Sequence, residues 1–572
     1  MYNEFLRNYL VGRKRFFCYN NDMLKYSRLF LVLSFFIGIL AWATSSFCSD
    51  NAFAKISIHG DKIYAGDEEL LLVSAGYEHL RPGQGFEDPV PYKNYGYDLI
   101  DQDMKRIKEA GFNSIRTWDL PDEKYLELAQ KHGLWLVGGI WTDQRINLSD
   151  QIEIESQIQR VKAMAQTYAK YPNVAMLLIL NEPDFTVLAG ANPQKLKSYF
   201  DRLIAAAHES DPGVPVSFSN WSNASFIDSS SWDIISYNSY ATIPRFQNSI
   251  GYRGYVEGLI KAKGKGKPFY VSEFGFYTPT PHLDPNDLYV NFYVDSPKKQ
   301  ADYLLRDMDA LYQLPIAGAG LMSWLDNWDL VTSFTSPFIK RPQGWIDKDV
   351  HDIDCTEWAG ILSMDTDVKG VARPALAVIS HANQAILTQP DSENIYSATV
   401  PISIYIGDRV KRVSLVIDGR EINISLKSDS HWVRYQYVFK EKELKKHIIK
   451  VKAFDHSKRL IYKFERSFWT AEDNRLPQLS ITQIKNEQNT VFFIFLLKDE
   501  KGDPIPNAKI KWDFFDAYSW RDNDGNCTTD SKGTCTIKRF LFAQVQIVGA
   551  AYEYQRDAFK KKITDLYIYS HR

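Results

Sequence analysis

The sequence has 572 residues, more than one hydrophobic core normally spans, because cores stop growing beyond about 250–300 residues. Hydrophobic residues make up 45% of it and charged residues 24%, which excludes a disordered chain, a collagen-like chain and a polytopic membrane protein. With 68 Lys and Arg against 70 Asp and Glu, the net charge of −2 provides no electrostatic footprint for nucleic-acid binding.

The N-terminal segment 1–54 is typical of an export signal. Residues 29–49 carry no charge and are mostly apolar, and basic residues outnumber acidic ones before them. This run is long enough to span a bilayer, which takes about 20 residues, so a retained membrane anchor stays open. The small-x-small pattern Ala52-Phe53-Ala54 is that of a cleavage site, and we favour cleavage. We expect an exported protein that is secreted, periplasmic or at the cell surface.

Residues 55–389 alternate short apolar runs with amphipathic segments of helical length. The apolar runs predict eight strands, at Leu71–Ala75, Asn113–Thr117, Leu134–Ile140, Val174–Leu180, Val214–Ser219, Ile234–Tyr237, Phe269–Ser272 and Ala319–Trp324. Helices are predicted at Leu99–Ala110, Tyr125–His132, Ile152–Tyr171, Pro193–Ser210, Gln300–Tyr312 and Pro374–Ile386. Eight strand–helix units are typical of a (β/α)₈ TIM barrel. An open doubly wound sheet is the alternative, but no Gly-rich phosphate loop follows any of these strands.

The pattern changes to period-2 alternation after residue 389, which predicts two antiparallel β-sandwich domains at 390–474 and 475–572. The second one contains Asp503-Pro504-Ile505-Pro506-Asn507-Ala508 and Thr529-Asp530-Ser531-Lys532-Gly533, which resemble the turns of bacterial immunoglobulin-like surface domains. Cys527 and Cys535 flank a turn-rich segment there, and in an oxidising compartment we expect them to form a disulfide across a small hairpin. Cys355 has no partner or neighbour that would make it a nucleophile or a metal ligand.

Chemistry in a TIM barrel takes place at the carboxyl ends of the strands. Glu182 and Glu273 end the fourth and seventh predicted strands. A carboxylate at the end of a buried strand must be paired, hydrogen-bonded or neutralised, so a structural ion pair stays open for each. Two carboxylates at one barrel mouth suit glycosidic cleavage, in which one protonates the leaving oxygen and the other attacks the anomeric carbon.

The motifs at these strand ends resemble those of clan A glycoside hydrolases. Leu180-Asn181-Glu182-Pro183 follows the fourth strand, and Ser272-Glu273-Phe274-Gly275 ends the seventh. The similarity is greatest to the family 2 barrel domain, then to family 5, and it covers about residues 70–330. It implies a retaining β-glycosidase with Glu182 as the acid/base and Glu273 as the nucleophile.

The same resemblance implies roles for further residues around these two. Asn181 would hold the sugar 2-hydroxyl, Tyr240 would orient the nucleophile, and Arg116 would keep it ionised. For Arg116, a structural salt bridge with Asp119 is the alternative. Trp324 would form the floor of the sugar subsite. Three further tryptophans, Trp118, Trp141 and Trp221, follow strand ends. We expect their rings either to stack on sugar rings or to pack in the barrel.

The sequence departs from family 2 in its domain order, because no sandwich precedes the barrel and two follow it. The segment 325–370 has no counterpart and is expected to shape the cleft. No cofactor motif and no set of metal ligands stands out. We predict an exported retaining β-glycoside hydrolase that acts on a β-linked oligo- or polysaccharide. The alternatives are a transglycosylase using the same site and a non-catalytic carbohydrate-binding or adhesion protein.

Overall fold

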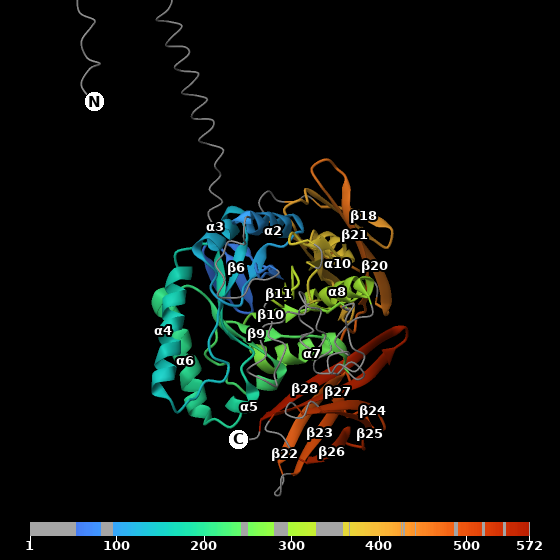
Figure 1. Cartoon of the computed structure of the whole chain (residues 1–572). Helices are drawn as coiled ribbons and strands as arrows, with labels where there is room; N and C mark the ends of the chain where they lie inside the picture. Colours follow the sequence, from blue (N-terminus) through green and yellow to red (C-terminus); the bar gives the residue numbers. More distant parts are fainter. Residues whose placement is uncertain are drawn as a thin grey trace, which may run out of the picture. The chain divides into compact units, whose positions relative to one another are not determined.

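The computed structural model (Figure 1) describes residues 53–81, 95–241, 250–278, 296–327, 358–364, 367–424, 426, 430–440, 442–485, 490–516, 521–540 and 545–570. The apolar segment 29–49 and Cys355 lie outside these residues, as does most of the segment 325–370. Within the described part of the chain, none of the helices has the length and hydrophobicity to cross a membrane.

Eight parallel strands form a closed barrel, which confirms the predicted fold. In barrel order they are β4 (Leu72–Gly76), β5 (Ser114–Arg116), β6 (Trp135–Ile140), β7 (Val174–Asn181), β8 (Val216–Asn220), β9 (Ile235–Asn238), β10 (Phe269–Phe274) and β11 (Gly318–Leu321). Most of their residues are buried on both faces, as expected of strands that lie between a filled barrel interior and a layer of helices.

Several of the helices around the barrel begin at side chains that cap them. Asp122, Asp150 and Asn192 each accept hydrogen bonds from the first turn of the helix that follows. The helices are α2 (Asp98–Glu109), α3 (Glu123–Lys131), α4 (Gln151–Tyr168), α5 (Phe185–Leu188), α6 (Pro193–Ser210), α7 (Gly251–Leu259), α8 (Pro297–Tyr312) and α10 (Pro374–Ala382).

The last predicted helix is shorter than expected. It ends at Ala382, and Ala385–Gln389 forms strand β14, which pairs with β16 (Thr399–Ile406) of the next domain. The first sandwich therefore begins before residue 390.

A small sheet precedes the barrel, made of β1 (Ile56–His59), β2 (Lys62–Ala65) and β3 (Glu68–Glu69). Its Ile56 and Ile63 pack with Leu72, Trp135 and other residues at the amino ends of the barrel strands. This sheet covers the end of the barrel opposite to the carboxyl ends of the strands.

Two β-sandwiches follow the barrel, as predicted. The first consists of sheets β14-β16-β19 and β15-β21-β20-β17-β18, and the second of sheets β22-β23-β26 and β25-β24-β27-β28. The remaining strands are β12 (Leu362–Ser363), β13 (Val371–Ala372), β15 (Ile395–Tyr396), β17 (Arg412–Ile417), β18 (Arg420–Asn423), β19 (Trp432–Val438), β20 (Lys445–Phe454), β21 (Leu460–Thr470), β22 (Gln478–Lys485), β23 (Thr490–Lys498), β24 (Lys509–Asp516), β25 (Arg521–Thr528), β26 (Thr534–Phe540), β27 (Val545–Arg556) and β28 (Phe559–Ser570). Each sandwich has its own hydrophobic core.

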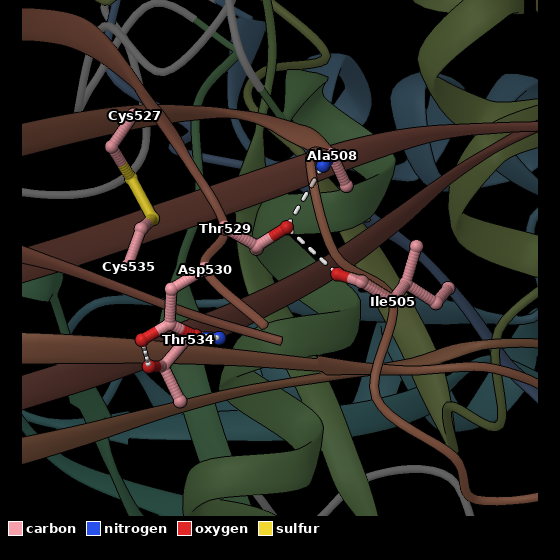
Figure 2. The surroundings of a disulfide bond; sticks show 7 residues. All are labelled: Ile505, Ala508, Cys527, Thr529, Asp530, Thr534 and Cys535. Atoms are coloured by element: carbon pink, nitrogen blue, oxygen red, sulfur yellow. Dashed lines mark hydrogen bonds between the residues drawn. A yellow bond between two sulfur atoms is a disulfide. The ribbon is translucent and has the colours of Figure 1, made fainter. Parts of the chain in front are cut away.

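Cys527 and Cys535 form the predicted disulfide (Figure 2). They lie on β25 and β26, which belong to different sheets, so the bond joins the two sheets and does not close a hairpin within one. The connecting turn is held by Thr529, whose hydroxyl donates to the carbonyl of Ile505 at 2.7 Å and accepts from the amide of Ala508 at 2.8 Å.

Candidate active site

The mouth of the barrel brings together polar side chains from four strand ends. Because all eight strands are parallel, their carboxyl ends meet at one side of the barrel. Arg116 ends β5, Asn181 ends β7, Asn238 ends β9, and Glu273 is the penultimate residue of β10. Glu182 follows β7 directly.

The carboxylate of Glu273 is buried and is held by three donors. Its Oε1 accepts from the indole N–H of Trp118 at 2.9 Å and pairs with Nη2 of Arg116 at 2.8 Å. Its Oε2 accepts from the hydroxyl of Tyr240 at 2.5 Å. Hydrogen bonds and an opposite charge both favour a carboxylate in its ionised form. This arrangement matches the requirements of a fixed, negatively charged nucleophile.

Arg116 links the two glutamate strands. Besides Glu273, its Nη2 donates to Oδ1 of Asn181 at 2.7 Å, and its Cζ lies 3.8 Å from the centre of the Trp118 ring. Asp119 pairs instead with Arg160 at 2.7 Å, at the exposed edge of the mouth. The predicted alternative, a structural pair between Arg116 and Asp119, is therefore wrong.

Glu182 lies in a different environment from Glu273. It is half-buried, and its Oε1 accepts from Nδ2 of Asn238 at 2.8 Å. The same Nδ2 lies 3.2 Å from Oδ1 of Asn181, and the hydroxyl of Ser272 donates to Oδ1 of Asn238 at 2.7 Å. Both Leu180 and Glu182 have positive φ angles, 64° and 48°, in a region of backbone conformation that residues other than glycine rarely adopt. Backbone strain of this kind gathers at functional sites.

The phenol of Tyr240 is affected by the charges of both glutamates. Burial, followed by the charge of Glu273, raises the pKa of the Tyr240 phenol well above its usual range, and the charge of Glu182 adds to this shift. The phenol therefore stays protonated and can donate to Glu273 over the whole neutral range. Asn238 contacts Glu182 and also Ser272, the neighbour of Glu273, so both glutamates lie at the mouth of the barrel.

The wall beside Glu273 is apolar. Met322, Tyr277 and Ala359 form a small cluster against which Trp118 and Tyr240 pack. Trp118 reaches this position because residue 76 is glycine, since a Cβ there would lie only 2.8 Å from the indole ring. The carbonyl of Trp358 accepts from the amide of Thr278, so the described end of segment 325–370 also borders this wall.

The three other tryptophans are placed differently from one another. Trp324 is fully buried and packs against Phe112 in the main core, so its ring offers no surface for a sugar and the predicted floor is wrong. At this strand end, Met322 borders the site instead. Trp221 is half-buried and donates to the carbonyl of Pro183 at 2.9 Å. Trp141 is 40% exposed just past β6, where its ring is accessible to a ligand.

Asn238 and Met322 are the site residues that sequence reasoning missed. Asn238 ends β9 two residues before Tyr240, so its place at a strand end was the available signal. Met322 gave no signal, because a methionine at a strand end is ordinarily a core residue. Across the described ranges, no group of three or more His, Cys, Asp and Glu side chains is arranged to hold a metal ion.

Residues 88–306 match the family described as "Glycosyl hydrolases family 2, TIM barrel domain", which confirms the resemblance carried by the strand-end motifs. No curated protein matches the sequence.

Among solved structures, the chain is similar to β-glucuronidase 3 of Bacteroides uniformis, with 16% identity, a TM-score of 0.43, and coverage of 90% of this chain and 65% of that one. A family 2 β-galacturonidase of Eisenbergiella tayi bound to galacturonate has 19% identity and a TM-score of 0.43, with coverage of 57% of this chain and 54% of that one. A β-glucuronidase of Ruminococcus gnavus in complex with D-glucuronic acid has 17% identity and a TM-score of 0.44, with coverage of 57% of this chain and 51% of that one. The chain thus spans between half and two thirds of these proteins, and at such TM-scores they bear on neither activity nor substrate.

Proposed function

We propose that the protein is an exported retaining hydrolase of a β-linked oligo- or polysaccharide, because residues 88–306 match the family 2 TIM barrel domain of the glycosyl hydrolases. The observation that carries this proposal is the contrast between the two glutamates. Glu273 is buried under three donors that stabilise its negative charge, whereas Glu182 is half-buried and accepts from the amide of Asn238.

In the first step, a carboxylate oxygen of Glu273 attacks the anomeric carbon and forms a glycosyl ester. The bond between that carbon and the leaving oxygen breaks, and Glu182 gives its proton to that oxygen. Arg116, Trp118 and Tyr240 hold the carboxylate in position, so the attack requires no reorganisation of the site. Asn181, fixed by Arg116 and Asn238, offers its amide to a sugar hydroxyl near the reacting carbon.

In the second step, Glu182 takes a proton from water as the water oxygen attacks the anomeric carbon. The ester bond to Glu273 breaks, its carboxylate returns, and the sugar leaves with its original configuration. A sugar hydroxyl in place of water would give transglycosylation at the same site.

Two observations support an exported protein, and two support a glycan substrate. The basic flank before the apolar segment 29–49 is that of an export signal, and a disulfide such as Cys527–Cys535 persists in oxidising compartments. The half-exposed Trp141 and the aromatic wall of Trp118 and Tyr240 suit the apolar faces of sugar rings.

The test is hydrolysis of a panel of aryl β-glycosides and β-linked polysaccharides by the wild type and by Glu273→Gln and Glu182→Gln. We expect Glu273→Gln to lose about 10³-fold or more in kcat, because the covalent route disappears. Asp119→Asn is the matched control, because Asp119 also follows a barrel strand but pairs with Arg160 at the exposed rim.

The covalent intermediate is tested directly. A 2-deoxy-2-fluoro glycoside should label the peptide that contains Glu273, and nuclear magnetic resonance should show the β-anomer as the first product. Equal activity in all variants would refute the assignment of the two glutamates. A wild type that binds glycans but turns over no member of the panel would favour the non-catalytic binding protein.

A further inference from the structure

A cavity of about 550 Å³ lies where helix α7 meets the second sandwich, and none of the candidate active-site residues lines it. Figure 1 shows α7 beside β28 and β27, with β22 and β23 below them. The cavity is lined by Glu257, Gly258, Lys261, Leu476, Pro477, Gln478, Leu479, Ser480, Leu496, Lys498, Lys561, Lys562, Ile563 and Thr564. Its volume falls within the range of small-ligand sites, about 300–1,000 Å³.

The elements around this cavity are held together by specific contacts. Asp565 of β28 accepts from Nζ of Lys261 at 2.8 Å and from the amide of Ile481 in β22 at 2.8 Å. Gly258 lets α7 approach β28, because a Cβ at that position would lie 2.6 Å from the Cβ of Leu566. These contacts hold α7, β22 and β28 together around the cavity.

The lining carries more positive than negative charge. Four lysines line it, against the single carboxylate of Glu257. Lys261 is neutralised by Asp565, and Lys561 donates to the uncharged amide oxygen of Asn394 at 3.1 Å. Lys498 and Lys562 are both only partly exposed, so their charges act across a region with less solvent screening than an open surface.

The rest of the lining is suited to a hydroxyl-bearing ring. Gln478, Ser480 and Thr564 supply neutral hydrogen-bonding groups, and Leu476, Pro477 and Leu479 supply an apolar wall. A bare inorganic anion would contact the lysines but leave most of the 550 Å³ unfilled. We propose that this cavity binds an acidic saccharide, whose carboxylate or sulfate ester lies against Lys498 and Lys562. That the anion is a sugar rests on the proposed function, whereas the anion site itself does not.

The proposal is tested by calorimetric titration of the full chain carrying Glu182→Gln, so that no probe is consumed. The probes are a trigalacturonide, a sulfated disaccharide, a neutral β-glucan trisaccharide and inorganic phosphate. We expect the acidic sugars to bind, with an affinity that falls as salt is added, and the neutral trisaccharide to bind at this cavity at least tenfold more weakly.

Lys498→Glu and Lys562→Glu should each raise the dissociation constant of the acidic sugars about tenfold, which corresponds to about 1.4 kcal/mol. Lys452→Glu on the exposed face of β20 makes the same change in net charge away from the cavity and should leave binding unaltered. In the background with Glu182 intact, all three lysine variants should hydrolyse aryl glycosides as the wild type does, which shows that they fold.

The two acidic sugar probes distinguish a carboxylate-bearing from a sulfated ligand. Binding that is equally strong for neutral and acidic sugars, or that Lys452→Glu weakens as much as the cavity variants, would overturn the proposal. Phosphate binding with no sugar binding would overturn its saccharide part. Because this titration needs no turnover, an inactive barrel with an intact anion site would refute the proposed function alone.

Discussion

Replacing Arg116 by Met tests the pair on which the proposed nucleophile depends. The change removes the guanidinium that lies 2.8 Å from Oε1 of Glu273 and 2.7 Å from Oδ1 of Asn181. The methionine keeps a flexible apolar side chain against the Trp118 ring, so the loss of charge is the main perturbation. Both members of the pair are almost completely buried, at 1% and 5% exposed.

At 2.8 Å and an effective dielectric constant of about 20, the Coulomb attraction within this pair is about 6 kcal/mol. Part of it offsets the cost of burying two charges, so the observable quantity is the penalty of leaving one charge alone. We expect Arg116→Met to destabilise the barrel by about 3–5 kcal/mol. Combining it with Glu273→Gln removes the orphaned carboxylate, so the double variant should be at least about 2 kcal/mol more stable than additivity predicts.

The assay is urea unfolding followed by tryptophan fluorescence, read from the transition that the single variants displace. Arg160→Met is the matched control. Its pair with Asp119 is 2.7 Å long, close to the 2.8 Å of the Arg116–Glu273 pair, but it is about 40% exposed and its loss should cost no more than about 1 kcal/mol. Additivity of Arg116→Met and Glu273→Gln within about 0.5 kcal/mol would refute the coupling, and with it the idea that Arg116 holds the nucleophile.

Three further outcomes are expected. Tyr240→Phe removes the hydroxyl 2.5 Å from Oε2 of Glu273 and should lower kcat about 10- to 100-fold while the melting temperature stays nearly unchanged; an unaltered kcat would contradict the positioning role. Burial raises the pKa of Asp307 to about 6 despite the opposing charge of Arg306. The native state thus keeps a proton that the unfolded state releases between about pH 4 and 6, and stability from this group falls as pH rises through that window. The free energy of unfolding of Asp307→Asn, taken relative to the wild type, should therefore be up to about 2–3 kcal/mol higher at pH 7 than at pH 4. A difference in melting temperature between variant and wild type that does not change with pH would contradict this. Cys535→Ser opens a bond between residues eight apart in sequence and should cost about 2–3 kcal/mol, measured by unfolding with and without reductant; an equal effect of reductant on the variant would count against it.

The barrel could be predicted because its signals are local. Apolar runs of strand length, capping side chains before helices and glycines with positive φ after them, such as Gly111 and Gly133, repeat along the sequence. Glu182 and Glu273 could be placed for the same reason, since a residue that ends a parallel strand must lie at the mouth.

The position of Trp324 could not be predicted in this way. Strand β11 ends at Leu321, so the alternation of side chains along a strand does not extend to residues 322–324. Met322 then packs beside Trp118 and Tyr240, whereas the Trp324 ring enters the core against Phe112. The end of α10 was missed for a related reason, because Ala385–Gln389 becomes a strand only through its pairing with β16, which local sequence does not specify.

The closure of the barrel, more than any single motif, assembles the candidate site. Arg116 ends β5 and Glu273 lies on β10, and two strands, β4 and β11, separate them in the sheet. Below the mouth, the hydroxyl of Tyr270 on β10 donates to Ser74 on β4 at 2.8 Å, and Ser74 lies 2.6 Å from the hydroxyl of Ser114 on β5. This buried chain of hydroxyls spans the same strands that Arg116 and Glu273 join one layer above. In an open sheet, side chains from strands that are not neighbours have no enclosed interior in which to meet. The distance between guanidinium and carboxylate is therefore set by the packed interior of the barrel, and the charge on Glu273 is stabilised by a partner that only a closed fold can supply.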